Sequence, residues 1–159
     1  GRYSLILTPI EEIHPSVSAL PLYAEEQKLY CGAAHPLFRT SQQASVEEVK
    51  RHPYVARTYM KGAAQSRDVQ FNQCAMTSHM EAIAILINSG RYLGYLPEHF
   101  ARTSVESGAM TSLLDERLAY FDTFHLVHRK DERNRSTHAL KTCLTKALVA
   151  GVPGAPDLH

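Results

Sequence analysis

One segment constrains the fold more than any other, residues 76–100, with the sequence MTSHMEAIAILINSGRYLGYLPEHF. Ser78 followed three residues later by Glu81 is the pattern of a capping box, which predicts a helix that starts at Ser78. Apolar residues then recur at three- and four-residue spacing. Gly90 stands where a left-handed residue ends a helix, so the helix should stop near Ser89. The segment therefore opens with one short amphipathic helix.

A strand and a second helix are expected directly after this glycine. The nearly all-apolar run over residues 92–96 is typical of a strand buried on both faces. Pro97 suits the first position of a helix, which we expect to run to Ser107 and to stop at Gly108. Helix, strand and helix in succession predict an α/β sheet in which this strand has parallel neighbours.

The same signals occur before this segment. Ser45 and Glu48 form a second capping box, and Pro53 should end that helix because the residue before a proline is pushed out of the helical region. Residues 54–58 then read as a strand. A further helix is expected to begin after Gly62.

One strand is expected at the N-terminal end of the chain, and a strand followed by a helix is expected at the C-terminal end. Residues 1–8 alternate as a strand does, and the run FDTFHLVHR from Phe121 reads as a half-buried strand. The last helix carries one apolar stripe and should be capped by Ser136. The Pro- and Gly-rich residues 151–159 are expected to form a flexible tail.

Composition limits the classes of function. The chain has 159 residues, which suits about one domain with a real core. Lys and Arg number 17 against 16 Asp and Glu, a net charge of +1, whereas a DNA-binding domain usually has a basic face. No run of about 18 apolar residues predicts a membrane span, and the start lacks the layout of a signal peptide. A cytoplasmic protein that does not contact DNA through this chain is expected.

No residue pattern points to catalysis, a metal or a cofactor. Three cysteines without a CxxC argue against a disulfide framework or a zinc site, so all are expected to be structural, buried thiols: Cys31, Cys74 and Cys143. His125 and His128 stand three apart on a strand and should face opposite sides, so they cannot bind one metal ion. His35 is interpreted as a turn residue before a proline rather than a general base.

The ordered motifs resemble one known family. The sequence SGRYLGYLP is similar to the Gly-x-Gly-x-x-x-x-Pro region in the effector-binding domain of LysR-type transcriptional regulators, although Tyr92 replaces the second glycine and predicts altered packing there. Other segments resemble the family's strand pair ending in His-Pro-Leu, its short helix and strand, its small-residue loop and its last helix: residues 22–38, 45–55, 106–116 and the helix from Ser136. The resemblance covers about residues 1–149.

The resemblance implies a two-lobed, periplasmic-binding-protein-like (type II) α/β fold. In this fold, residues 1–21 would form part of lobe I and residues 22–120 a complete lobe II. Residues 121–150 would return to lobe I and include the C-terminal helix, and residues 151–159 would form the tail. Lobe I is then partial, and part of it is expected to be absent from this sequence. The resemblance also implies homodimers or tetramers, and DNA contact through an N-terminal winged helix-turn-helix outside this chain.

Candidate ligand-binding residues follow from where the predicted strands end, because open α/β sheets bind ligands at the carboxyl ends of their strands. This rule selects Thr8 and Pro9, Arg57, Thr58 and Tyr59, and Ser78. The first two groups also match cleft positions of the family. The Arg57 guanidinium could pair a carboxylate through two hydrogen bonds, or could equally face the other side of its strand as a surface ion-pair partner. For Ser78, helix capping is an alternative role.

These observations favour a ligand-sensing and oligomerisation domain of a LysR-type regulator. A small, anionic effector, such as an aromatic acid, an amino acid or another organic anion, would shift the equilibrium between two arrangements of the lobes and dimer. Two alternatives share the fold. A solute-binding protein of a transporter would begin with a secretory signal, and an enzyme, the less favoured alternative, would need a reactive residue in the cleft.

Overall fold

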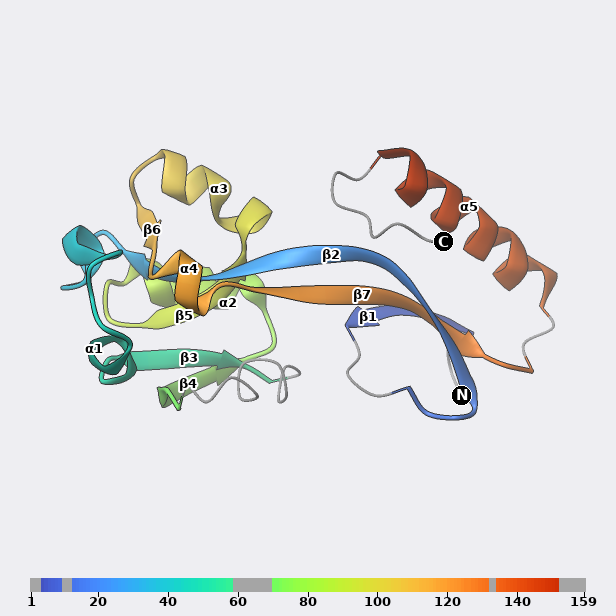
Figure 1. The fold of residues 1–159 in the computed structure, drawn as a ribbon, viewed down its shortest axis with the longest axis horizontal. Coiled ribbons are helices and arrows are strands. Elements are labelled where there is room, and N and C mark those ends of the chain that lie inside the picture. The colour runs from blue at the N-terminus through green and yellow to red at the C-terminus, as the bar shows by residue number, and fades with distance from the viewer. Residues whose placement is uncertain (1–3, 10–12, 59–69, 132–133, 152–159) are drawn as a thin grey trace. The chain divides into compact units, whose positions relative to one another are not determined.

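The computed structural model describes residues 4–9, 13–58, 70–131 and 134–151, with the side chains of the last helix described up to residue 147. The chain divides into two compact units (Figure 1). Unit 1 combines Gly1–Glu25 with Phe121–His159, and unit 2 is Glu26–Tyr120. The assignment of residue ranges to particular lobes stays a prediction.

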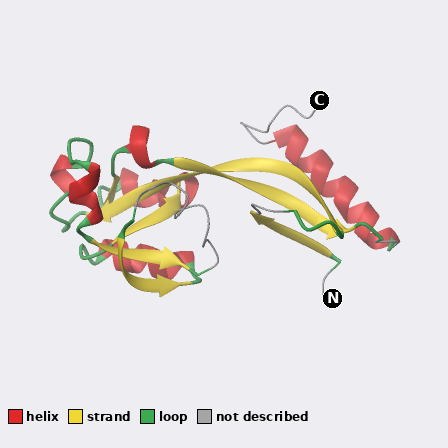
Figure 2. Cartoon of the chain, turned by 60° about the horizontal axis from the view of Figure 1, so that its bottom comes forward, coloured by secondary structure: helices red, strands yellow, loops and turns green. Residues whose placement is uncertain are grey.

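Most helices of the described residues, drawn red in Figure 2, belong to unit 2, while the last one, α5 (Arg135–Gly151), belongs to unit 1. Strand β2 (Val17–Gly32) begins in unit 1 and ends in unit 2. In chain order the elements are β1 (Leu5–Pro9), β2 (Val17–Gly32), the 3-10 helix η1 (Phe38–Thr40), α1 (Val46–Lys50), β3 (Pro53–Arg57), β4 (Asn72–Thr77), α2 (Met80–Asn88), β5 (Leu93–Pro97), α3 (Glu98–Glu106), β6 (Met110–Ser112), α4 (Asp115–Leu118), β7 (Tyr120–Arg129) and α5 (Arg135–Gly151).

The sheet is mixed. Its strand order is β1-β7-β2-β5-β3-β4, and β6 also pairs with β2. Strand β3 is parallel to both β4 and β5, but β5 is antiparallel to β2. The predicted α/β sheet is therefore confirmed, and the prediction of parallel neighbours is right on one side of β5 and wrong on the other. A run of buried apolar residues carries no information about the direction of the strands beside it.

Helix α2 starts later than its sequence predicts. Its N-cap is His79, without a side-chain cap, and the backbone N–H of His79 donates to Thr77 Oγ1 at 3.2 Å. The predicted cap at Ser78 is wrong, because the backbone is still extended at His79. The Thr77 hydroxyl, rather than Ser78, accepts a backbone hydrogen bond just before the helix. The predicted end is confirmed, since Ser89 is the C-cap and Gly90 has a φ of +72°.

Other predicted helix limits hold to within a residue or two. Ser45 Oγ accepts from the Glu48 backbone N–H at 3.1 Å, as the capping box predicts. Pro97 is the N-cap of α3 rather than its first residue. The predicted cap at Ser136 is wrong, because Asn134 Oδ1 accepts from the Ser136 backbone N–H at 2.9 Å and α5 begins between them. The helix expected after Gly62 lies outside the described residues.

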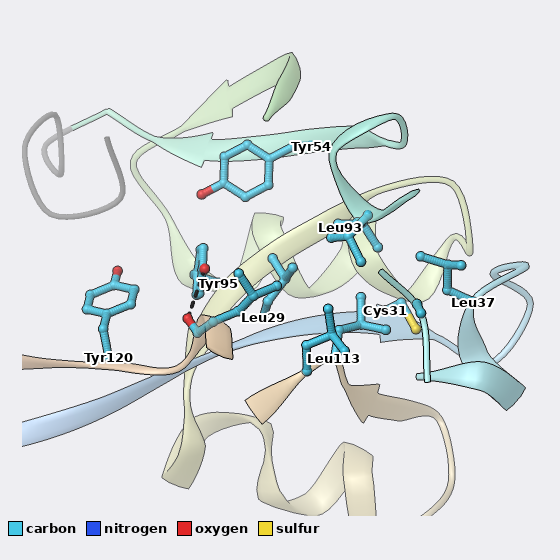
Figure 3. Close-up of a cluster of buried hydrophobic side chains, with 12 residues drawn as sticks. Leu29, Cys31, Leu37, Tyr54, Leu93, Tyr95, Leu113 and Tyr120 are labelled. Atoms are coloured by element: carbon cyan, nitrogen blue, oxygen red, sulfur yellow. Dashed lines mark hydrogen bonds between the residues drawn. The ribbon is translucent and has the colours of Figure 1, made fainter. Parts of the chain in front are cut away.

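Two clusters of buried apolar side chains form the core of unit 2. In one cluster the labelled tyrosines Tyr54, Tyr95 and Tyr120 lie toward one side, and Leu37 and Cys31 lie toward the other (Figure 3). The second cluster lies between α2, α3 and the sheet, and half-buried Tyr92 packs against it. The clusters comprise Leu29, Cys31, Leu37, Ala44, Val49, Tyr54, Leu93, Tyr95, Leu113, Leu114, Leu118 and Tyr120, and Tyr30, Val55, Ile83, Ile87, Leu96, Ala101 and Met110.

Two glycines let α2 approach the sheet closely. A Cβ on Gly94 would lie 2.9 Å from side-chain atoms of Ile83 and Val55. A Cβ on Gly32 would clash with the backbone carbonyl oxygen of Ile87, which cannot turn aside. These contacts fix α2 against β5 and the end of β2.

In unit 1, β1 pairs antiparallel with β7. The rings of Tyr23 and Phe124 stack with centroids 5.0 Å apart. Lys141 Nζ on α5 lies 3.0 Å from His128 Nε2 on β7, which links the last helix to this strand.

Candidate functional site

The carboxyl ends of β3, β4 and β5 meet at one edge of the sheet, because these strands are parallel. Arg57 is paired with Thr77 in the β3–β4 register, and the backbone N–H of Thr58 donates to the Thr77 carbonyl at 3.1 Å. Helix α2 begins three residues after Thr77, and α3 begins directly after β5. We call residues 57–58 and 77–81 the Arg57 edge. It has the geometry at which open α/β sheets bind ligands.

Arg57 turns its side chain into unit 2. The residue is only 8% exposed, and its Nη2 donates to Gln27 Oε1 at 2.8 Å and to the Tyr95 carbonyl oxygen at 3.1 Å. A surface ion-pair role, one of the two alternatives from the sequence, does not fit this burial. The two hydrogen bonds hold the guanidinium in one orientation at the carboxyl end of its strand.

Gln27 was missed by the sequence reasoning, although a signal for it exists. Its side chain shares one face of β2 with Leu29 and Cys31, at a spacing of two residues, and all three are fully buried. A polar residue in register with buried apolar ones must find a hydrogen-bond partner inside the protein. Gln27 finds Arg57, which comes from a different strand.

Tyr95 was missed as well, because a buried tyrosine in an apolar run reads as core. Its hydroxyl donates to the Leu118 carbonyl oxygen at 3.0 Å, the dashed bond in Figure 3. Its ring contacts those of Tyr120, Phe71 and Tyr54, at centroid distances of 5.1, 6.0 and 6.2 Å. Burial raises the pKa of Tyr54 to about 12, although Arg57 acts in the opposite direction. The group beside Arg57 is thus aromatic and uncharged at neutral pH.

The predicted ligand-binding residues fall into separate places. Thr58 and Ser78 are exposed; Thr58 is hydrogen-bonded to Thr77, the register partner of Arg57, and Ser78 follows Thr77 in the chain. Thr8 and Pro9 belong to unit 1, where the Thr8 hydroxyl donates to the Pro9 carbonyl at 3.1 Å. Tyr59 lies outside the described residues.

Within the described ranges, no three His, Cys, Asp or Glu side chains come together as metal ligands. His125 and His128 pair with different residues of β1, Thr8 and Leu5. His35 lies in a turn, as expected, and its Nδ1 accepts from the Leu37 backbone N–H at 3.1 Å. No helix in the described part of the chain is long and apolar enough to cross a membrane.

The expectation of buried thiols is confirmed for one cysteine. Cys31 is fully buried, and burial raises the pKa of its thiol to about 12. Cys74 and Cys143 are exposed, so the expectation is wrong for them. Cys74 lies on β4, a strand at the edge of the sheet, and Cys143 lies on α5 and is not a member of either buried cluster.

The fold and the edge together are those of a ligand-binding α/β domain. Residues 1–149 match the family model described as the LysR substrate binding domain, and the chain belongs to this family. Solved regulatory domains share the fold at low sequence identity. The effector-binding domain of QuiR in complex with shikimate has a TM-score of 0.78 at 14% identity, over 96% of this chain and 75% of that one. The bromide-bound regulatory domain of HypT from Salmonella typhimurium has a TM-score of 0.72 at 15% identity, over 93% and 73%.

A curated relative agrees with this assignment. The HTH-type transcriptional activator BauR of Pseudomonas aeruginosa is 40% identical over 135 residues, which are 84% of this chain and 44% of BauR. The chain thus spans less than half the length of this relative. The resemblance read from the sequence and the type II periplasmic-binding-protein-like fold are confirmed, and a regulator's effector-binding domain is favoured over a transporter's solute-binding protein. BauR is a transcriptional activator and HypT is a LysR-type transcriptional regulator.

Proposed function

We propose that this chain senses a small anionic effector at the Arg57 edge, with Arg57, Thr58 and Ser78 as its first contacts. The observation that carries the proposal is a guanidinium held in one orientation on the last residue of β3, a residue paired with Thr77, three residues before α2 begins. Arginine suits planar carboxylates, and a helix N-terminus adds backbone N–H donors and a favourable dipole. Thr8, Pro9 and Tyr59 stay proposed contacts from the family resemblance.

The proposal extends to the whole regulator. The effector would favour one arrangement of a homodimer or tetramer and so change how winged helix-turn-helix domains, encoded outside this sequence, bind DNA in the cytoplasm. A ligand can shift such an equilibrium only by its difference in affinity for the two arrangements. Catalysis is not part of this proposal.

Thermal unfolding against a panel of compounds tests the proposal. The panel contains shikimate, sodium bromide, aromatic acids, amino acids and short organic acids. An effector at 100 times its dissociation constant stabilises the folded state by about 2.7 kcal/mol, which raises the unfolding temperature by roughly 5–10 °C.

Two variants locate the site. Arg57→Lys keeps a positive charge but loses the planar fork, so the temperature shift should shrink by more than half. Arg91→Lys makes the same change at an exposed arginine of unit 2 and should keep the full shift. A full shift in Arg57→Lys, or a shift lost equally in both variants, would contradict the Arg57 edge as the site.

A further inference from the structure

We propose that Gln27 and Tyr95 are positioning residues of the effector site, and that they link Arg57 to both points where the chain passes between its two units. These points are the boundaries 25/26 and 120/121. The inference rests on the proposed function of the Arg57 edge. It adds a route by which a change at Arg57 would reach both connections.

The first link runs to the connection in β2. Gln27 is the second residue of unit 2, which begins at Glu26, and its side chain is completely buried. Its Oε1 accepts from Arg57 Nη2 at 2.8 Å. The side chain of Arg57, on β3, thereby holds β2 in place next to this connection.

The second link runs to the connection before β7. Tyr95 Oη donates to the Leu118 carbonyl oxygen at 3.0 Å, two residues before unit 2 ends, and the Tyr95 ring packs against Tyr120 at 5.1 Å. Arg57 Nη2 in turn donates to the Tyr95 carbonyl oxygen at 3.1 Å. One residue of β5 therefore contacts Arg57 through its backbone carbonyl oxygen and, through its side chain, the segment that leads out of the unit.

A single nitrogen atom joins the two links. Arg57 Nη2 donates to Gln27 and to Tyr95, so its displacement changes both hydrogen bonds at once. An anion that draws the guanidinium toward the exposed end of β3 would lengthen both bonds. Because Gln27, Tyr95 and Leu118 are buried, the displacement meets closely packed neighbours rather than solvent.

Hydrogen exchange of the 159-residue chain, without any added compound, tests the network. Tyr95→Phe removes only the hydroxyl that Leu118 accepts from, while Tyr92→Phe makes the same chemical change three residues earlier at a hydroxyl outside any hydrogen bond among the described residues. In Tyr95→Phe, exchange should be about fivefold faster in residues 116–121, the cost of one lost hydrogen bond, and about twofold faster in residues 25–29. Tyr92→Phe should change neither segment.

A second pair of variants tests the route in the other direction. Gln27→Met removes the acceptor, and exchange should become severalfold faster in residues 116–121 as well as near residue 27. Gln27→Glu keeps an acceptor oxygen and should restore slow exchange in both segments. Residues 99–106 of α3 serve as the internal reference, because global unfolding would speed their exchange too.

A change confined to residues 116–121 in Tyr95→Phe, or near residue 27 in Gln27→Met, would overturn the network and leave two local hydrogen bonds. Since no compound is added, this result does not depend on effector binding. An intact exchange response together with no thermal shift from any compound would support the network and contradict the proposed function.

Discussion

The two units of the chain differ in how they bury apolar side chains. Unit 2 contains both buried clusters. In the described part of unit 1, the buried apolar residues are Leu22 and Leu126. Other large apolar side chains of this unit are exposed, including Ile6, Leu7, Ile13, Phe121 and Leu140. Burial of apolar surface is the main favourable term in folding. Unit 2 should therefore hold most of the free energy of unfolding, and the proposed ligand edge is built on this more stable unit.

The largest expected effect comes from the core under α2. Ile83 is fully buried, so Ile83→Ala should lower the free energy of unfolding by about 2–5 kcal/mol through lost burial and a new cavity. Ile85 stands two residues later on the same helix and is 70% exposed, so Ile85→Ala is the matched control and should cost less than about 0.5 kcal/mol. Urea unfolding measures both. Equal losses would show that α2 does not pack as described.

The next largest loss of stability is expected from substituting either of two glycines, Gly32 and Gly108. Gly32→Ala places a methyl group against the Ile87 carbonyl oxygen and should cost about 1–3 kcal/mol. Gly108→Ala meets no atom within 4 Å, but its φ of +73° makes a side chain cost about 1 kcal/mol. Thermal unfolding of both variants compares the two costs. A Gly108 variant that loses more than the Gly32 variant would contradict the close contact between α2 and β2.

The pH dependence of unit 2 gives a smaller effect. Burial, with a further contribution from His52, lowers the pKa of His35 to about 4 from its usual 6.5. The unfolded chain then binds a proton that the folded chain does not, so stability is lost as the pH falls from about 6.5 toward 4, with a loss of about 2 kcal/mol already at pH 5. Urea unfolding at a series of pH values measures this loss.

His35→Asn separates this effect from other titrations. Asparagine can accept from the Leu37 backbone N–H in the same way but does not titrate, so the variant should lose stability less steeply between pH 6.5 and 4. An unchanged slope would assign the loss to other groups.

The smallest expected effect tests unit 1. Phe121 is 65% exposed, so Phe121→Ser should change the free energy of unfolding by less than about 0.5 kcal/mol. Chemical unfolding at two protein concentrations measures it. A loss above about 1 kcal/mol that depends on concentration would break the comparison, because it would mean that another copy of the chain covers this side chain in solution.

Local signals predicted elements better than they predicted what elements do together. The order of α2, β5 and α3 follows from apolar spacing, Gly90 and Pro97, all of which act within a few residues. Two caps were misplaced, at Ser78 and Ser136, because the side chains of Thr77 and Asn134 accept from the backbone N–H groups of His79 and Ser136 where these helices begin.

The candidate site shows the same limit. The position of Arg57 at a strand end could be predicted, since it depends on one strand and the rule for α/β sheets. Its partners could not, because Gln27 and Tyr95 lie 30 and 38 residues away in the chain and meet it only after three strands have paired. A buried glutamine on an apolar face signals that a partner exists without saying which one.

The most direct test of the account is a titration of the ¹⁵N-labelled chain, followed by NMR, with the compound that gives the largest thermal shift. Backbone amide signals of Thr58, Ser78, His79 and Glu81 should move most, together with that of Gln27 through its hydrogen bond to Arg57. Signals that move instead around Lys28, Glu98 and Arg102, or around Gln42, Glu116 and Arg117, where pockets lie in unit 2, would contradict the assignment of the site to the Arg57 edge.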